Sequence, residues 1–228
     1  MPTTLAPARV LTPDEVAAYH RDGFLIVRGL YSGQQMLDWK AVMKTCLTGP
    51  FMQIGICVWM SDAIHPTLRD AMADNHIVPI LRQLIGDPLA FLSAKAVFKD
   101  TGTRFGTPWH QDWYYWFGSP KTSVWIALDD ATPDNGCLKL VPGSHKMSFR
   151  NIKDEGEGLV NRIDEKQIQG LPIVDGKVNR GDVVFFTDRT VHASHPNTAG
   201  ADRWSLISTY RRADVPDDST AWKTAMPV

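Results

Sequence analysis

The second half of this chain is divided into short segments rich in aromatic and β-branched residues, and no other feature limits its fold so strongly. Gly, Pro, Asn or Asp residues separate the segments, as they separate consecutive β-strands. The segments are residues 90–99, 107–116, 122–129, 137–141, 182–187, 190–195 and 203–211. Short strands at this spacing are typical of a sandwich or barrel. We therefore expect a mainly β fold built on a double-sheet jelly roll.

The first part of the chain, residues 1–89, carries mostly helix signals. Two capping boxes, Thr12 with Glu15 and Ser32 with Gln35, mark helix starts. The expected elements are a helix from 13 that stops at Gly23, a buried strand at 24–27, a helix from 33 to about 47, and a helix at 77–85 closed by Gly86. We expect the helices to pack on one sheet of a jelly-roll core at 90–212, within one domain covering residues 1–228. A polar stretch, residues 151–176, should run over the mouth of the barrel.

Composition limits the classes of partner. The chain has 228 residues, of which 43% are hydrophobic and 21% are charged, and its net charge is −1. Without a long basic run, neither nucleic acid nor an anionic membrane is expected as a partner. Three cysteines without CxxC spacing indicate no disulfide framework and no zinc site, which suits a reducing compartment. No signal-peptide pattern opens the chain, and the apolar stretch 51–60 is too short to cross a bilayer, so we expect a cytoplasmic protein.

A His-x-Asp pair lies in the second predicted strand, at His110 and Asp112. In a strand, residues i and i+2 project to the same face, so both side chains could reach one ion. Six aromatic residues crowd the pair: Trp109, Trp113, Tyr114, Tyr115, Trp116 and Phe117. The rings alone would also suit a barrel core, but an aspartate among them is costly unless it is paired or metal-bound. A similar pair, His20 and Asp22, falls at a predicted helix end, where i and i+2 do not face each other.

A second imidazole would come from a histidine later in the chain. His145 lies in a turn-like segment, and His195 directly precedes Pro196 at a strand end. His192 follows a buried strand and opens the next short strand. Position favours His192, whereas the pattern alone leaves the other two open. Two imidazoles and one carboxylate on one face of a metal leave positions free for a co-substrate and dioxygen, which suits non-haem Fe(II).

Arg203 and Arg211 fall on one face of the predicted strand 203–211. Eight residues separate them by about 26 Å in an ideal strand, so they cannot share one small ligand. A surface position is the default for either. However, an arginine on a barrel strand next to a metal histidine suits the binding of a carboxylate through two parallel hydrogen bonds.

Several motifs occur together in a recognisable order. They are Tyr19-His20-Arg21-Asp22-Gly23-Phe24, His110-Gln111-Asp112, Asn135-Gly136-Cys137-Leu138, Pro142-Gly143-Ser144-His145, His192-Ala193-Ser194 and Arg203. In order and approximate spacing the chain resembles the phytanoyl-CoA dioxygenase-like family of Fe(II)- and 2-oxoglutarate-dependent oxygenases. The resemblance covers nearly the whole chain. Its combined motifs are specific, although no single motif is.

The resemblance implies a double-stranded β-helix core with iron bound by His110, Asp112 and His192, which settles the choice among the histidines. It also implies that Arg203 binds the distal carboxylate of 2-oxoglutarate. By the same resemblance, three residues support the co-substrate: Ser194, Thr107 and Trp125. The chain is short for the family and has no feature of a coenzyme A pocket, which argues against the namesake substrate.

The expected reaction is 2-oxoglutarate-dependent oxidation of an unactivated C–H bond by dioxygen, releasing succinate and CO2. Because Asp112 is present, no metal position is vacated for a halide, and we predict hydroxylation. Tyr114 and Trp116 would contact the substrate if the strand continues unbulged. Phe117 and Arg211 are further candidates. We expect a small-molecule substrate such as an amino acid or a natural-product intermediate.

Two alternatives remain. Desaturation and ring closure begin with the same hydrogen abstraction as hydroxylation. A protein of another class, a cupin-like isomerase or a metal-binding protein without redox function, could use similar metal ligands. Arg203 and Ser194 argue against this second alternative, because an isomerase needs no site for 2-oxoglutarate.

Overall fold

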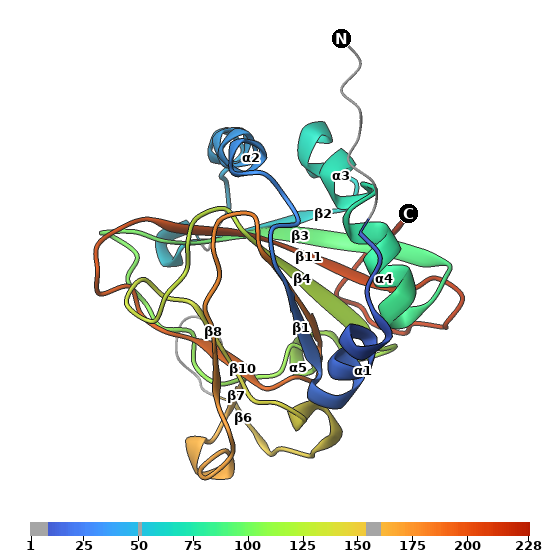
Figure 1. The fold of residues 1–228 in the computed structure, drawn as a ribbon, viewed down its shortest axis with the longest axis vertical. Coiled ribbons are helices and arrows are strands. Elements are labelled where there is room, and N and C mark those ends of the chain that lie inside the picture. Colours follow the sequence, from blue (N-terminus) through green and yellow to red (C-terminus); the bar gives the residue numbers. More distant parts are fainter. Residues whose placement is uncertain (1–8, 50–51, 154–160) are drawn as a thin grey trace.

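A large antiparallel sheet forms the centre of the molecule. The computed structural model describes residues 9–49, 52–153 and 161–228. Figure 1 shows α2 and α3 on one side of the long strands β3 and β11, with β8 and β10 on the other side. The fold is therefore a jelly-roll core with helices against one sheet, and the predicted fold class is confirmed. None of the helices in these ranges is long and apolar enough to cross a membrane.

The helices are α1 (Pro13–Asp22), α2 (Gly33–Thr45), α3 (Pro66–Met72), α4 (Ile77–Ile85) and α5 (Trp113–Trp116), with 3-10 turns η1 (Met52–Ile54), η2 (Ser144–Lys146) and η3 (Glu165–Gln167). The large sheet has the order β1 (Phe24–Val27), β9 (Val183–Thr187), β4 (Lys121–Ala127), β11 (Arg203–Arg212), β3 (Leu89–Lys99) and β12 (Met226–Pro227), and β2 (Ile56–Met60) also pairs with β3. The smaller sheet has the order β10 (His192–Ser194), β5 (Leu138–Leu140) and β8 (Val174–Gly176), and β6 (Asn151–Lys153) pairs with β7 (Asn161–Ile163).

Local capping explains where the first helices begin. The Thr12 hydroxyl accepts a hydrogen bond from the Glu15 amide at 3.2 Å, and the Glu15 carboxylate accepts one from the Thr12 amide at 2.9 Å. Ser32 and Gln35 form the second box at the start of α2. Gly23 ends α1 with φ 84°, a conformation that favours glycine. The predicted helix starts and the strand at 24–27 are confirmed, and α2 ends at Thr45, two residues earlier than expected.

Alternation along the central strands divides the core into two layers. On β4, Val124 and Ile126 pack with the helices, whereas Trp125 and Ala127 face the smaller sheet. Both faces of the large sheet are therefore buried, and β9 reads as an almost continuous apolar run. The space between the two sheets is where side chains of β3, β4, β9 and β11 meet those of the smaller sheet.

One predicted strand is wrong. Within residues 107–116, only His110 pairs with a neighbour, through an isolated bridge to His192, and residues 113–116 form α5. Asp112 has helical backbone angles, φ −60° and ψ −28°. Long-range contacts outweigh the strand preference of the aromatic residues here, since the Trp113 amide donates to the Asp188 carbonyl at 2.9 Å.

The stretch at 151–176 only partly follows its prediction. Instead of remaining a polar excursion, it contributes β8 to the smaller sheet. Ile163 and Ile168 are buried and pack in one cluster with Trp109. Residues 154–160 of this stretch lie outside the described residues.

Candidate active site

A cavity of about 350 Å³ lies between the two sheets. Strands β2, β3, β4, β9 and β11 of the large sheet and β5 and β10 of the smaller sheet line it. Its volume is at the lower end of the usual range for ligand pockets. The cavity therefore has room for a small molecule.

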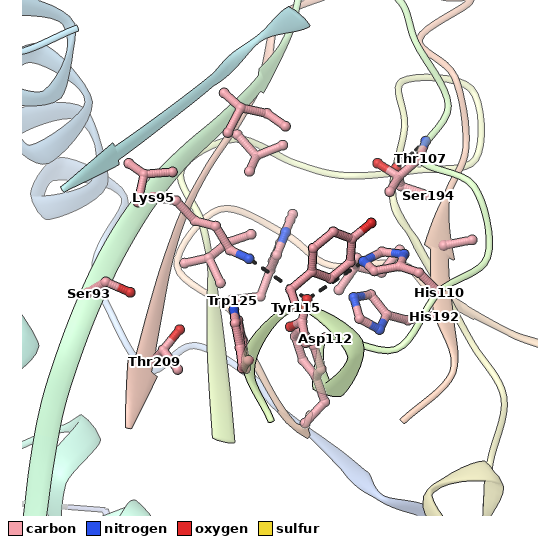
Figure 2. A pocket seen from close by; sticks show the side chains of 18 of the residues that line it. Ser93, Lys95, Thr107, His110, Asp112, Tyr115, Trp125, His192, Ser194 and Thr209 are labelled. Carbon is pink, nitrogen blue, oxygen red and sulfur yellow. Dashed lines mark hydrogen bonds and ion pairs between the residues drawn. The ribbon is translucent and has the colours of Figure 1, made fainter. Parts of the chain in front are cut away.

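The predicted metal ligands converge at this cavity. His110, Asp112 and His192 are all buried, and each offers a ligand atom within 4.8 Å of the other two. His110 Nε2 lies 3.7 Å from Asp112 Oδ1, and the two imidazole centroids are 4.1 Å apart. The bridge between His110 and β10 brings the two histidines together. Figure 2 shows both rings beside the Asp112 carboxylate.

Backbone carbonyls fix the orientation of both imidazoles. His110 Nδ1 lies 2.9 Å from the Pro108 carbonyl oxygen, and His192 Nδ1 lies 2.9 Å from the Thr190 carbonyl oxygen. Because a carbonyl can only accept, each Nδ1 carries the proton and each Nε2 keeps its lone pair. This is the arrangement in which histidine ligates a metal.

The electrostatics of the site favour the same protonation states. Burial would raise the pKa of Asp112, but the nearby Lys95 ammonium and the two imidazoles outweigh burial and hold that pKa below its usual value. Burial and the neighbouring His110 lower the pKa of His192 to about 3. The Ser123 hydroxyl donates to Asp112 Oδ2 at 3.2 Å. At neutral pH the site presents an anionic carboxylate and a neutral imidazole, as metal binding requires. These residues fit a divalent iron ion.

Two buried cations stand at one end of the cavity. Arg203 and Lys99 are directly paired between β11 and β3, and both are almost fully buried. Neither forms an ion pair with a carboxylate in the described part of the chain. Burial and Arg203 lower the pKa of Lys99 to about 7, and burial lowers the pKa of Arg203 to about 10. Two such cations are costly without an anion.

The hydrogen bonds of Arg203 leave one edge of its guanidinium free. Its Nη1 donates to the Val97 carbonyl at 3.2 Å and to the Ser205 hydroxyl at 2.9 Å. Its Nε is buried and has no hydrogen-bond partner in the described structure. The edge formed by Nε and Nη2 is one that binds a carboxylate through two parallel hydrogen bonds. This orphaned donor fits a diacid such as 2-oxoglutarate.

The residues predicted to support the co-substrate lie at the same end. The Ser194 hydroxyl accepts hydrogen bonds from Lys99 Nζ at 2.8 Å and from the Thr107 amide at 3.1 Å. The Trp125 ring lies in the cavity wall, 5.7 Å from the Arg203 guanidinium. The structure brings all these side chains to one place.

The predicted substrate contacts are only partly brought to the cavity. Trp116 lines it, but Tyr114, Phe117 and Arg211 do not. The turn of α5 is the reason, because a helical turn does not keep residues 114 and 116 on one face as a strand would. Tyr114 donates to the Phe149 carbonyl, Phe117 is 54% exposed, and Arg211 forms an ion pair with Asp217 at 3.4 Å.

Sequence reasoning gave no role to Lys95, Tyr115 and Trp222, which line the cavity, or to Lys99, which donates a hydrogen bond to Ser194 in its wall. A lysine in a strand has the local pattern of a surface residue. The alternation of β3 could have pointed to both lysines, since odd positions from Ser93 to Lys99 share a face. Trp222 comes from the C-terminal segment, which has no strand or helix signal nearby.

A second group of ligand-type side chains lies outside the cavity. Cys137, Asp175 and His195 also have ligand atoms within 4.8 Å of one another. His195 Nε2 is already bonded to Asp175 Oδ1 at 2.7 Å, and Asp175 is exposed. Burial raises the pKa of the Cys137 thiol to about 12.

Known proteins resemble this chain over most of its length. The phytanoyl-CoA dioxygenase (PhyH) family matches residues 4–205. An ectoine dioxygenase of Bordetella bronchiseptica is 25% identical over 236 residues, covering 89% of this chain and 76% of that protein. The structure of EctD from S. alaskensis with 2-oxoglutarate and 5-hydroxyectoine matches with a TM-score of 0.77 at 20% identity, covering 99% of this chain and 87% of EctD. The non-haem 2-oxoglutarate-dependent carbocyclase SnoK from nogalamycin biosynthesis matches with a TM-score of 0.76 at 24% identity, covering 91% of this chain and 86% of SnoK.

The match over residues 4–205 places the chain in the phytanoyl-CoA dioxygenase family. The chain is a 2-oxoglutarate-dependent non-haem iron enzyme, with iron as its cofactor and 2-oxoglutarate as its co-substrate. The sequence predictions of family, enzyme class and cofactor are confirmed.

Proposed function

We propose that this protein hydroxylates an unactivated C–H bond of a small molecule, with iron held by His110, Asp112 and His192. The observation that carries the proposal is the convergence of these ligand atoms within 4.8 Å, with both Nε2 lone pairs free. Iron, when bound there, supplies the activation of dioxygen that no side chain can supply. The protein contributes position, charge and the exclusion of water.

Arg203 and Lys99 hold the distal carboxylate of 2-oxoglutarate in this proposal. The free Nε edge of Arg203 offers two parallel donors, and Lys99 adds a second positive charge beside it. The Ser194 hydroxyl supports this end, because it accepts hydrogen bonds from Lys99 Nζ and from the Thr107 amide. Two buried cations without an anionic partner are costly, and a bound carboxylate removes that cost through charge-assisted hydrogen bonds.

The overall reaction balances in atoms and electrons. One oxygen atom of dioxygen enters the substrate as a hydroxyl group, and the other enters the carboxylate of succinate. The carboxyl group next to the keto carbon leaves as CO2, and the two electrons of that C–C bond complete the reduction of dioxygen. The whole process needs no further reductant, since dioxygen takes two electrons from 2-oxoglutarate and two from the C–H bond of the substrate.

Succinate release across a panel of small metabolites tests the proposal. Amino acids, cyclic amino-acid derivatives and aromatic acids would be supplied with Fe(II), 2-oxoglutarate and air. We expect one group of compounds to raise succinate formation well above the uncoupled rate, with product heavier by one oxygen atom. A product lighter by two hydrogen atoms would instead indicate desaturation or ring closure. Protein that forms no succinate with any compound, even slowly, contradicts the proposal.

A further inference from the structure

A lysine that forms no hydrogen bond in the described part of the chain lines the cavity. Lys95 Nζ is 4.0 Å from Asp112 Oδ1 and 5.4 Å from the centroid of the Trp116 ring, and these are its partners in the described part of the chain. It forms no hydrogen bond there. Figure 2 shows Lys95 extending from β3 toward Asp112, with Ser93 and Thr209 on one side of it. Its three N–H donors are available to a ligand.

Strand register separates Lys95 from the co-substrate end. Lys99 pairs with Arg203, whereas Lys95 pairs with Ile207. Four residues along a strand span about 13 Å, and the two carboxylates of a five-carbon diacid are only roughly 5 Å apart. The 2-oxoglutarate carboxylate that binds Arg203 is therefore too far along the strand to bind Lys95 as well.

The charges of the cavity call for an anion at Lys95. Among the described lining residues, Asp112 is the only acid, and Lys95 and Arg203 are the cations. A divalent metal adds two positive charges, and 2-oxoglutarate adds two negative ones. One positive charge then remains, even when Lys99 is left out. A bound metal would also share the negative charge of the Asp112 carboxylate, which is the anion nearest to Lys95 among the lining residues. A buried excess charge is costly, and a monoanionic substrate would remove it.

The walls beyond Lys95 are aromatic and apolar. Trp116 and Trp222 meet edge to face at 5.1 Å, and Trp222 Nε1 donates to the Ser93 hydroxyl at 2.9 Å. Met60 and Ile207 complete the wall on neighbouring strands. The C-terminal segment that carries Trp222 is held by Asp217, which accepts from Lys121 Nζ at 3.1 Å. These surfaces bury a flat or branched apolar body.

We propose that the substrate is a small monoanion, a carboxylate, phosphonate or sulfonate on an apolar body, whose charged group binds Lys95 and whose body packs against Trp116 and Trp222. This inference rests on the proposed function, because it assigns the substrate class of the same site. Lys95 selects the charge, and the two tryptophans select the shape.

The test compares acids with neutral partners of the same shape. A panel of linear, branched and aryl carboxylates, phosphonates and sulfonates, each paired with its amide or ester, is titrated into anaerobic protein loaded with Fe(II) and 2-oxoglutarate. Binding is measured from tryptophan fluorescence and from the visible band of the iron–2-oxoglutarate chelate. We expect at least one acid to bind roughly tenfold or more tightly than its neutral partner, as a charge-assisted hydrogen bond implies. If no acid outcompetes its partner, the proposal is overturned.

Two variants separate the contribution of Lys95 from general electrostatics. Lys95→Met should reduce the preference for the acid to within about twofold. Lys44→Met is the matched control, because Lys44 likewise lies over a tryptophan ring, 5.0 Å from the Trp204 centroid, but outside the cavity. It should keep the full preference. A preference that survives in Lys95→Met overturns the proposal.

The 2-oxoglutarate affinity of Lys95→Met distinguishes this inference from the proposed function. We expect the affinity to stay within about threefold of the original protein, because Arg203 and the metal hold the co-substrate. A loss as large as that of Arg203→Met would assign Lys95 to 2-oxoglutarate and overturn the inference. Failure of the original protein to form the chelate band would overturn the proposed function instead.

Discussion

The described part of this protein contains two groups of three ligand-type side chains, and the groups differ in which of their ligand atoms are already bonded. In the cavity group, carbonyl oxygens occupy Nδ1 of His110 and His192, and both Nε2 atoms are free. In the outer group, His195 Nε2 is already bonded to Asp175, and the Cys137 thiol keeps its proton.

Proximity alone therefore does not define a metal site, since both groups bring their atoms within 4.8 Å. The cavity group is fully buried, and the Nδ1–H groups of its two histidines point away from the position that a metal ion would take. The outer group satisfies its own polar atoms and includes an exposed carboxylate. A cation would gain little there and would have to displace a proton from sulfur.

Replacing one histidine in each group should give the largest difference in activity between the two groups. His192→Ala should abolish iron-dependent succinate formation, with a loss of about a thousandfold or more, because changes to outer partners of a metal ligand already cost roughly 10- to 100-fold. His195→Ala should keep activity within about threefold, since no iron ligand is lost. Succinate assays and iron content per chain measure both. Equal losses in the two variants would remove the distinction between the groups.

Arg203 tests the co-substrate end of the cavity. Arg203→Met removes two charge-assisted hydrogen bonds to the diacid, so we expect the KM for 2-oxoglutarate to rise about 100-fold. Iron binding should be unchanged. The measurement is succinate formation against 2-oxoglutarate concentration, together with iron content. An unchanged KM would contradict the role of Arg203.

Ser123 gives a smaller effect on the cavity group alone. Its hydroxyl donates to Asp112 Oδ2 at 3.2 Å, so Ser123→Ala leaves that oxygen without its partner. We expect iron affinity to fall roughly tenfold, as for other residues that orient a ligand. Competition with a chelator measures the affinity. Unaltered affinity would mean that this hydrogen bond does not position the carboxylate.

Lys99 connects the two groups, because it donates to both Ser194 and the His195 carbonyl. Its pKa is lowered to about 7, so above that pH the free protein carries a neutral amine, which must take up a proton from solvent when the 2-oxoglutarate dianion binds. Affinity for 2-oxoglutarate should therefore fall as pH rises above 7, by at most about tenfold per pH unit. Binding measured between pH 6 and 9 should show this slope, and Lys99→Met should flatten it. A slope retained in the variant would contradict the assignment.

Much of the fold and the candidate metal ligands could be predicted from the sequence, because local signals and a distinctive order of motifs pointed to them. Capping residues such as Thr12 and Glu15 act within one turn, and alternation defined β4 and β11. His110 and Asp112 do lie together, but strand alternation is not the cause, since Asp112 has helical backbone angles. Contacts with Asp188 and with the smaller sheet determine the backbone conformation at Asp112.

The rest of the cavity depended on long-range register, which the sequence did not contain in readable form. Lys99 matters because it stands opposite Arg203, more than one hundred positions later in the chain. Trp222 reaches the cavity only because Asp217 ties the C-terminal segment to Ser119 and Lys121. Tertiary contacts of this kind leave no periodic trace in the chain itself.

The most direct test of the central claim is the absorption of the protein under anaerobic conditions after addition of Fe(II) and then 2-oxoglutarate. Chelation of the iron by the 2-oxo acid gives a weak visible band. We predict that the original protein and His195→Ala develop this band at one iron per chain, and that His192→Ala does not. A band that persists in His192→Ala, or that never forms in the original protein, would contradict the account.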